Sequence, residues 1–135
     1  MKFTLSWLKD HLDTDKDLDT IVEKLTNIGL EIESVEDKSK TYSDFTVAEV
    51  LKAEKHPDAD RLKVCTVKSI NGTFQVVCGA PNARQGMKGI FAPENSFIPG
   101  TGVKLKKSTI RGVESCGMLV SEREMGISDE HDGII

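Results

Sequence analysis

The chain has 135 residues, of which 38% are hydrophobic and 30% are charged, and its formal net charge is −4. This length suits one domain, or one domain with a shorter segment, and the composition is that of an ordinary globular protein. No apolar run reaches the roughly 20 residues that a membrane span needs, and the N-terminus lacks the features of a signal peptide. We therefore expect a cytoplasmic protein with no membrane partner.

The charge is unevenly distributed along the chain. Residues 1–39 hold 5 Lys and Arg and 10 Asp and Glu, whereas residues 40–135 hold 13 and 12. The second part is therefore nearly neutral, and four of its cations fall within eight positions. These are Lys104, Lys106, Lys107 and Arg111. Such a cluster predicts a local basic patch with modest, salt-sensitive affinity for nucleic acid.

The first 39 residues have the pattern helix, helix, strand. Ser6 can cap a short helix, and Asp17 can cap a second helix that Gly29 ends. Residues 30–35 alternate polar and apolar side chains, which predicts a strand. About 40 residues rarely close a core without disulfides, a metal or a partner, so we expect this α/β segment to belong to a domain completed elsewhere.

Residues 37–44 are polar and predict a linker, after which the pattern changes to short strands. Asn71-Gly72 is the strongest hairpin signal in the sequence. The predicted strands lie at residues 45–53, 62–69, 73–78, 88–92, 102–105 and 117–120. Five or so short strands with Gly and Pro between them favour a small closed barrel, the OB-fold, over residues 40–135.

The sequence contains no local motif of an enzyme or a metal site. It has neither a phosphate-binding glycine loop nor a dinucleotide fingerprint, and its three histidines are scattered. The three cysteines, Cys65, Cys78 and Cys116, are widely spaced and lack a Cys-x-x-Cys pair. We expect free, mostly buried thiols, with no catalytic residue, no metal site and no cofactor within this chain.

Three stretches carry candidate functional residues. In residues 56–62, Pro57 restrains His56, and the stretch is either a corner that fixes strand register or an RNA contact through His56 or Arg61. In residues 77–84, Asn82 and Arg84 offer donors either for a turn or for RNA. In residues 104–126 the basic cluster adjoins polar side chains, and Ser121 with Glu124 makes a capping box. Phe74 and Phe91 are candidate stacking platforms, although the core is the preferred place for both.

These stretches resemble the tRNA-binding domain of synthetase-associated proteins. The matching motifs are His-Pro-x-Ala-Asp-x-Leu at 56–62, Val-Cys-Gly-Ala-x-Asn at 77–82 and Arg-Gly-x-x-Ser-x-Gly-Met at 111–118. On these motifs alone the host is open: a methionyl-tRNA synthetase appendage, a free-standing dimer or a cytokine-like homologue. Residues 1–8 and 29–35 resemble the start of the bacterial phenylalanyl-tRNA synthetase β subunit, and this choice implies that the chain is a truncated N-terminal piece.

The resemblance implies an auxiliary tRNA contact for a ligase that attaches phenylalanine to tRNA as a tetramer of two α and two β subunits. ATP and Mg²⁺ are implied for the parent enzyme, and its α subunit and other β-subunit domains are the implied protein partners. The tRNA contact is expected to be weak and electrostatic. The residues expected to meet RNA are Lys63, Asn82, Arg84, Lys104, Lys106, Lys107, Arg111, Ser115, Met118 and Ser121. The alternative is a protein-interaction domain with little RNA contact, which the acidic net charge favours.

Overall fold

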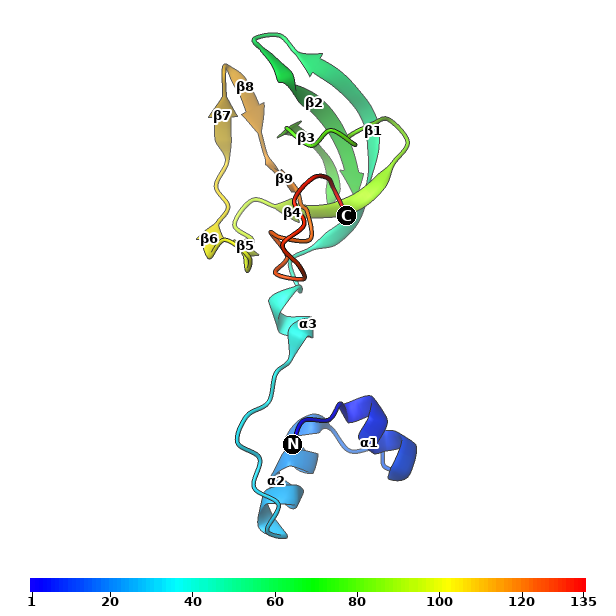
Figure 1. Ribbon diagram of the computed structural model, residues 1–135. Helices are drawn as coiled ribbons and strands as arrows, with labels where there is room; N and C mark the ends of the chain where they lie inside the picture. Colours follow the sequence, from blue (N-terminus) through cyan, green and yellow to red (C-terminus); the bar gives the residue numbers. More distant parts are fainter. The chain divides into compact units, whose positions relative to one another are not determined.

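The computed structural model describes residues 1–135 and divides the chain into two compact units, Met1–Asp37 and Lys38–Ile135. Composition places this boundary two residues later, between residues 39 and 40. The helices lie in the first part of the chain and the strands in the rest (Figure 1).

The first unit contains two helices, α1 (Leu5–His11) and α2 (Leu18–Asn27). Thr4 caps α1 by accepting a hydrogen bond from Trp7 N at 3.1 Å, so the prediction that Ser6 would cap this helix is wrong. A cap needs extended backbone, which Thr4 has, whereas Ser6 already lies inside the helix.

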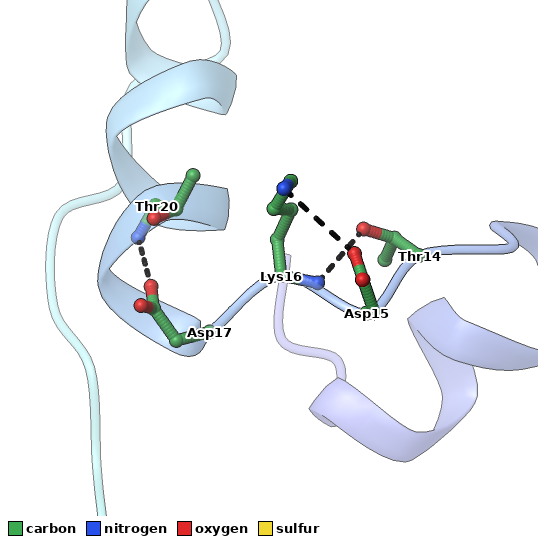
Figure 2. Close-up of polar contacts among 5 residues, drawn as sticks. All are labelled: Thr14, Asp15, Lys16, Asp17 and Thr20. Carbon is green, nitrogen blue, oxygen red and sulfur yellow. Dashed lines mark hydrogen bonds and ion pairs between the residues drawn. The ribbon is translucent and has the colours of Figure 1, made fainter.

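The α2 boundaries confirm the sequence prediction. The Asp17 carboxylate accepts a hydrogen bond from Thr20 N at 2.8 Å (Figure 2), and this bond lowers the pKa of Asp17. Just before it, Thr14 Oγ1 accepts a hydrogen bond from Lys16 N at 3.2 Å. At the other end Gly29 has φ +92°, a conformation that glycine adopts readily and that ends the helix.

Residues 30–35 form no strand, so that prediction is wrong. A strand requires a neighbour to accept and donate its backbone hydrogen bonds, and the first unit has no other strand. The apolar stripe of α2 is also poorly covered, because Ile21 is buried whereas Ile28 is 73% exposed.

The predicted linker contains a helical turn, α3 (Lys38–Thr41). The Tyr42 hydroxyl donates to Met125 O at 2.9 Å, and the Tyr42 ring meets Phe45 edge-on. The stretch is therefore joined to the second unit rather than being a free linker.

The second unit is built on a five-stranded antiparallel sheet with the order β3-β2-β1-β4-β9 (Figure 1). This confirms a mainly β fold. The sheet strands are β1 (Thr46–His56), β2 (Ala59–Ser69), β3 (Gly72–Cys78), β4 (Lys88–Pro93) and β9 (Gly117–Leu119). Two small hairpins supplement it, formed by β5 (Phe97–Ile98), β6 (Val103–Lys104), β7 (Ser108–Ile110) and β8 (Val113–Ser115).

The sheet does not close into the predicted barrel, because no ladder joins β3 to β9. A single backbone bond, from Cys116 N to Gln75 O at 2.9 Å, links β3 to the segment between β8 and β9. Gly117, with φ +134°, turns the chain immediately after that bond, and a Cβ there would lie 2.6 Å from Ala92 O. The ladder therefore stops after one bond, and the side chains of Gln75 and Ser115 provide further hydrogen bonds between β3 and β8.

The hairpin between β2 and β3 forms as predicted, but its turn is shifted by one residue. Ser69 pairs with Gly72, so Ile70 and Asn71 are the turn residues, and neither has a positive φ. Gly72, with φ +129°, instead begins β3. The Asn-Gly pair therefore marks the position of the hairpin, but its two residues are not the two central residues of the turn.

The core of the second unit consists of two clusters of buried side chains. The larger lies inside the sheet and includes Val67, Val76 and Phe91. The smaller is formed by Ala92, Ile98, Val120 and Met125 with partly buried neighbours. Phe74 and Phe91 pack together with ring centroids 5.1 Å apart, so both candidate stacking platforms belong to the core.

Candidate nucleic-acid interface

His56 holds the tips of two hairpins together. Its Nδ1 accepts a hydrogen bond from Asp58 N at 3.1 Å, so Nε2 carries the proton and donates to Ile110 O at 3.0 Å. The His56 side chain is 4% exposed. This arrangement matches the corner that fixes strand register, and it leaves no imidazole nitrogen for RNA.

Arg111 lies at the turn of the β7–β8 hairpin and strengthens the same junction. Arg111 and Gly112 have φ values of +48° and +83°, the pair of positive angles that characterises a type I′ turn. The Arg111 guanidinium donates to Asp58 O at 2.9 Å and stays exposed. Its charge faces solvent, but one of its donors already serves the fold.

The loop after β3 uses the predicted residues for internal bonds. Lys63 Nζ donates to Ala83 O at 2.6 Å, and it is half-buried. The Asn82 amide pairs with the backbone of Ile134, donating to its carbonyl at 3.0 Å and accepting from its N–H at 2.9 Å. Arg84 is exposed, and its guanidinium makes one long hydrogen bond, 3.5 Å, to Asn82 O.

The polar residues after β7 are also used within the fold. Ser115, 3% exposed, accepts from Val77 N and donates to Gly117 O, each at 3.1 Å. Ser121 is buried, and its N–H donates to the Glu124 carboxylate, which is half of the predicted capping box. Its hydroxyl also donates to this carboxylate, a bond that is not part of a capping box. The segment that follows is a turn rather than a regular helix. Met118 packs partly buried against the smaller core cluster.

The basic cluster is exposed, but its members differ in their partners. Lys107 pairs with Glu114 at 2.9 Å, an interaction that raises the pKa of Lys107 and lowers that of Glu114. Lys104 and Lys106 are exposed and form no ion pair. All three lysines are exposed on the same short stretch of chain, and Lys104 and Lys106 carry charges that no ion pair compensates.

A family described as "Putative tRNA binding domain" matches residues 45–135. The chain belongs to this family. The matched residues are the sheet, both small hairpins and all ten predicted RNA-contact residues. The resemblance deduced from the three motifs is thereby confirmed.

Curated relatives cover the whole of the chain. It is 58% identical over 142 residues to the phenylalanine–tRNA ligase beta subunit of Nitrobacter winogradskyi, and 61% identical over 137 residues to that of Mesorhizobium japonicum. All of this chain is covered in both cases, but it spans only 18% and 17% of those proteins.

Similarity to solved structures concerns the fold. A mutant RNA ligase of Naegleria gruberi with ATP and Mn aligns with a TM-score of 0.51 at 17% identity, covering 62% of this chain and 29% of that one. A MetRS related protein from Pyrococcus horikoshii is 29% identical, covers 64% of this chain and 76% of that one, and has a TM-score of 0.47.

The tRNA-binding domain has one exposed aromatic side chain that the sequence patterns did not single out, Phe97. Residues 38–135 contain no other exposed Phe, Tyr or Trp side chain. A signal was available, because Phe97 stands between Ser96 and Ile98, and alternation in a strand puts it on the opposite face from both. Nothing in the sequence says which of these faces is buried.

The cysteines confirm the expectation of free, mostly buried thiols. Cys65 and Cys78 are buried, and Cys116 is half-buried. Burial, with a smaller effect from Cys78, raises the pKa of Cys65 to about 11, so this thiol stays protonated and unreactive at neutral pH.

No group of three or more His, Cys, Asp and Glu side chains is arranged to hold a metal ion. None of the helices has the length and apolar character needed to cross a membrane.

Proposed function

We propose that this chain is the tRNA-binding module of a phenylalanine–tRNA ligase beta subunit and that it gives auxiliary contact to tRNA. Its relatives with that name share 58% and 61% of their aligned residues with it over its whole length. The ligase reaction, with its ATP and Mg²⁺, then belongs to the remainder of a cytoplasmic enzyme. The α subunit and other beta-subunit domains are the protein partners of the whole assembly.

The proposal of an RNA contact rests on Lys104 and Lys106, which are both exposed and have no ion-pair partner. Binding of the nucleic-acid backbone depends on cations that can replace condensed counterions at phosphates. Lys107 can contribute only in competition with Glu114, and Lys63 is engaged with the backbone of its own domain. The contact is therefore weak and electrostatic, in keeping with the net charge of −4.

Titration of the chain with tRNA at a series of salt concentrations tests this function. We expect log affinity to fall linearly with log salt, and Lys106→Ala to weaken binding and to reduce the slope by about one unit. Lys9→Ala is the matched control, because Lys9 is exposed but lies outside the matched residues 45–135. Equal effects of Lys9→Ala and Lys106→Ala, or binding that ignores salt, would contradict the proposal.

The acidic net charge supports one other candidate, a protein-interaction domain with little RNA contact. Light scattering on the same samples separates the two. A dimer without measurable tRNA binding would favour the interaction domain, whereas a monomer that binds tRNA in a salt-dependent way would favour the tRNA-binding module.

A further inference from the structure

One side of the β5–β6 hairpin is largely buried, although Val103, the ladder partner of Ile98, is 55% exposed. Phe97 pairs with Lys104, and the ladder continues through the bond from Leu105 N to Ser96 O at 2.8 Å. Ser96 and Ile98 are each 1% exposed, and Leu105 packs against the smaller core cluster. Phe97 stands between Ser96 and Ile98, and its ladder partner Lys104 precedes Leu105. Since strand side chains alternate, Phe97 and Lys104 point to the other side.

The exposed face combines an aromatic ring with two cations. Phe97 is 51% exposed, and its partner in the ladder, Lys104, is exposed beside it. Lys106 lies two residues further along, just after β6, and is also exposed. The hairpin is fixed from behind by its buried face, so the ring is held in place rather than carried on a loose loop.

We propose that Phe97, Lys104 and Lys106 form a subsite for one unpaired nucleotide of RNA, in which the base stacks on the Phe97 ring and the lysines meet its flanking phosphates. This inference rests on the proposed function and adds to it a chemical specificity for single-stranded RNA. Base–aromatic stacking accepts any base, because every base offers a flat π face. An unpaired base is required, since the bases of an RNA helix are stacked on one another.

The charges around the hairpin favour a polyanion over an apolar protein surface as the occupant. Neither Lys104 nor Lys106 has a carboxylate partner, and the nearby Lys107 is balanced by Glu114. Glu94, just before the hairpin, interacts electrostatically with Lys107 and Cys116. A protein partner that covered Phe97 would have to bury two uncompensated lysines, whereas RNA supplies a phosphate for each.

The test uses the full chain, tRNA, and two short fluorescent single-stranded RNAs that differ only in whether one central position is abasic. We expect Phe97→Ala to weaken binding of the intact RNA by roughly tenfold, within the range measured for loss of one stacked base, and to leave the salt slope unchanged. Phe97→Trp should restore binding. Ile70→Ala is the matched control, because Ile70 is an exposed apolar residue, 87% accessible, at the β2–β3 turn.

The outcomes separate this inference from the function beneath it. Loss of the Phe97→Ala effect on the abasic RNA supports the stacking subsite. If the wild-type chain binds RNA and Lys106→Ala weakens this binding but Phe97→Ala does not, the subsite is overturned and the proposed function stands. An Ile70→Ala effect as large as that of Phe97→Ala also overturns the subsite, as does Phe97→Ala turning a dimer into a monomer with RNA affinity unchanged. No tRNA binding by the wild-type chain overturns both proposals.

Discussion

The two units of this chain differ in how their apolar side chains are covered. In Met1–Asp37 Ile21 is the one buried hydrophobic residue, whereas Trp7 and Leu30 are each more than half exposed. In Lys38–Ile135 two clusters fill the space behind the sheet and its hairpins. Local hydrogen bonds therefore maintain the first unit, and burial of apolar surface maintains the second.

This difference has a consequence for function. Phe97 and Lys104 stand on the β5–β6 hairpin, which packs through Ile98 and Leu105 against the smaller core cluster, so their backbone geometry is fixed before RNA arrives. Preorganised groups lose less conformational entropy on binding than mobile ones. A first unit without a core offers no comparable support for a binding site.

The largest expected effect comes from Phe91→Ala. Phe91 is 1% exposed, packs against Phe74 and lies opposite Leu119 in the sheet. Its truncation should cost about 3–5 kcal/mol of unfolding free energy, a large part of the stability of a small domain. Calorimetry on the full chain measures this.

Trp7→Ala is the control for Phe91→Ala in the other unit. Trp7 is 55% exposed, so its removal should change the free energy of unfolding of the second unit by less than about 0.5 kcal/mol. Trp7 is also the only tryptophan, and its fluorescence reports on the first unit. Loss of the Trp7 signal in parallel with the calorimetric transition would show that the two units unfold together and are therefore not maintained independently.

A smaller effect is expected from Ser115→Ala. The Ser115 hydroxyl accepts from Val77 N, and Val77 is buried, so removal of the hydroxyl leaves a buried N–H without a partner. Such a group costs about 1–3 kcal/mol. Denaturant unfolding measures the change, and Ser108→Ala, at the exposed position opposite Ser115 in the β7–β8 ladder, is the matched control.

The contradictory result for Ser115 would be informative. A stable Ser115→Ala variant that binds tRNA poorly would show that this serine acts on RNA rather than on the junction between β3 and β8. Equal losses of stability in Ser115→Ala and Ser108→Ala would instead remove the distinction between the buried and the exposed hydroxyl.

The features that could be predicted from the sequence are those decided by a few neighbouring residues. The Asp17 cap bonds a residue three positions away, and Gly29 ends its helix through its own backbone freedom. The strand at residues 30–35 depends on a partner strand, which alternation within one segment cannot reveal. The Asn71-Gly72 pair located a hairpin because turn chemistry is local, but the ladder register decided which residues form the turn.

The candidate site is less accessible to sequence reasoning for the same physical reason. Asn82 and Arg84 look alike as exposed donors in a loop, yet Asn82 bonds Ile134, 52 residues away. Lys106 and Lys107 are adjacent, and only the folding of β8 against β7 provides Lys107 with Glu114. The family motifs identified the binding domain, whereas long-range contacts distinguish the cations that are free from those in use.

The smallest expected effect concerns pH and the first unit alone. Hydrogen bonds to Thr20 lower the pKa of Asp17 from its ordinary value of 3.8, because they favour the charged carboxylate. A group with a lowered folded pKa stabilises the fold above its unfolded pKa, and that contribution is lost as the pH falls through the folded pKa. The Thr20 amide resonance should therefore shift in acid with a midpoint below 3.8, as α2 begins to fray at its N-terminus.

Asp17→Asn is the control, because it keeps a capping oxygen but has no titrating charge. The Thr20 resonance of this variant should therefore show no such midpoint. A wild-type midpoint at or above 3.8 would mean that the Asp17 cap does not form in solution, and the first unit would then lack one of the local hydrogen bonds that maintain it.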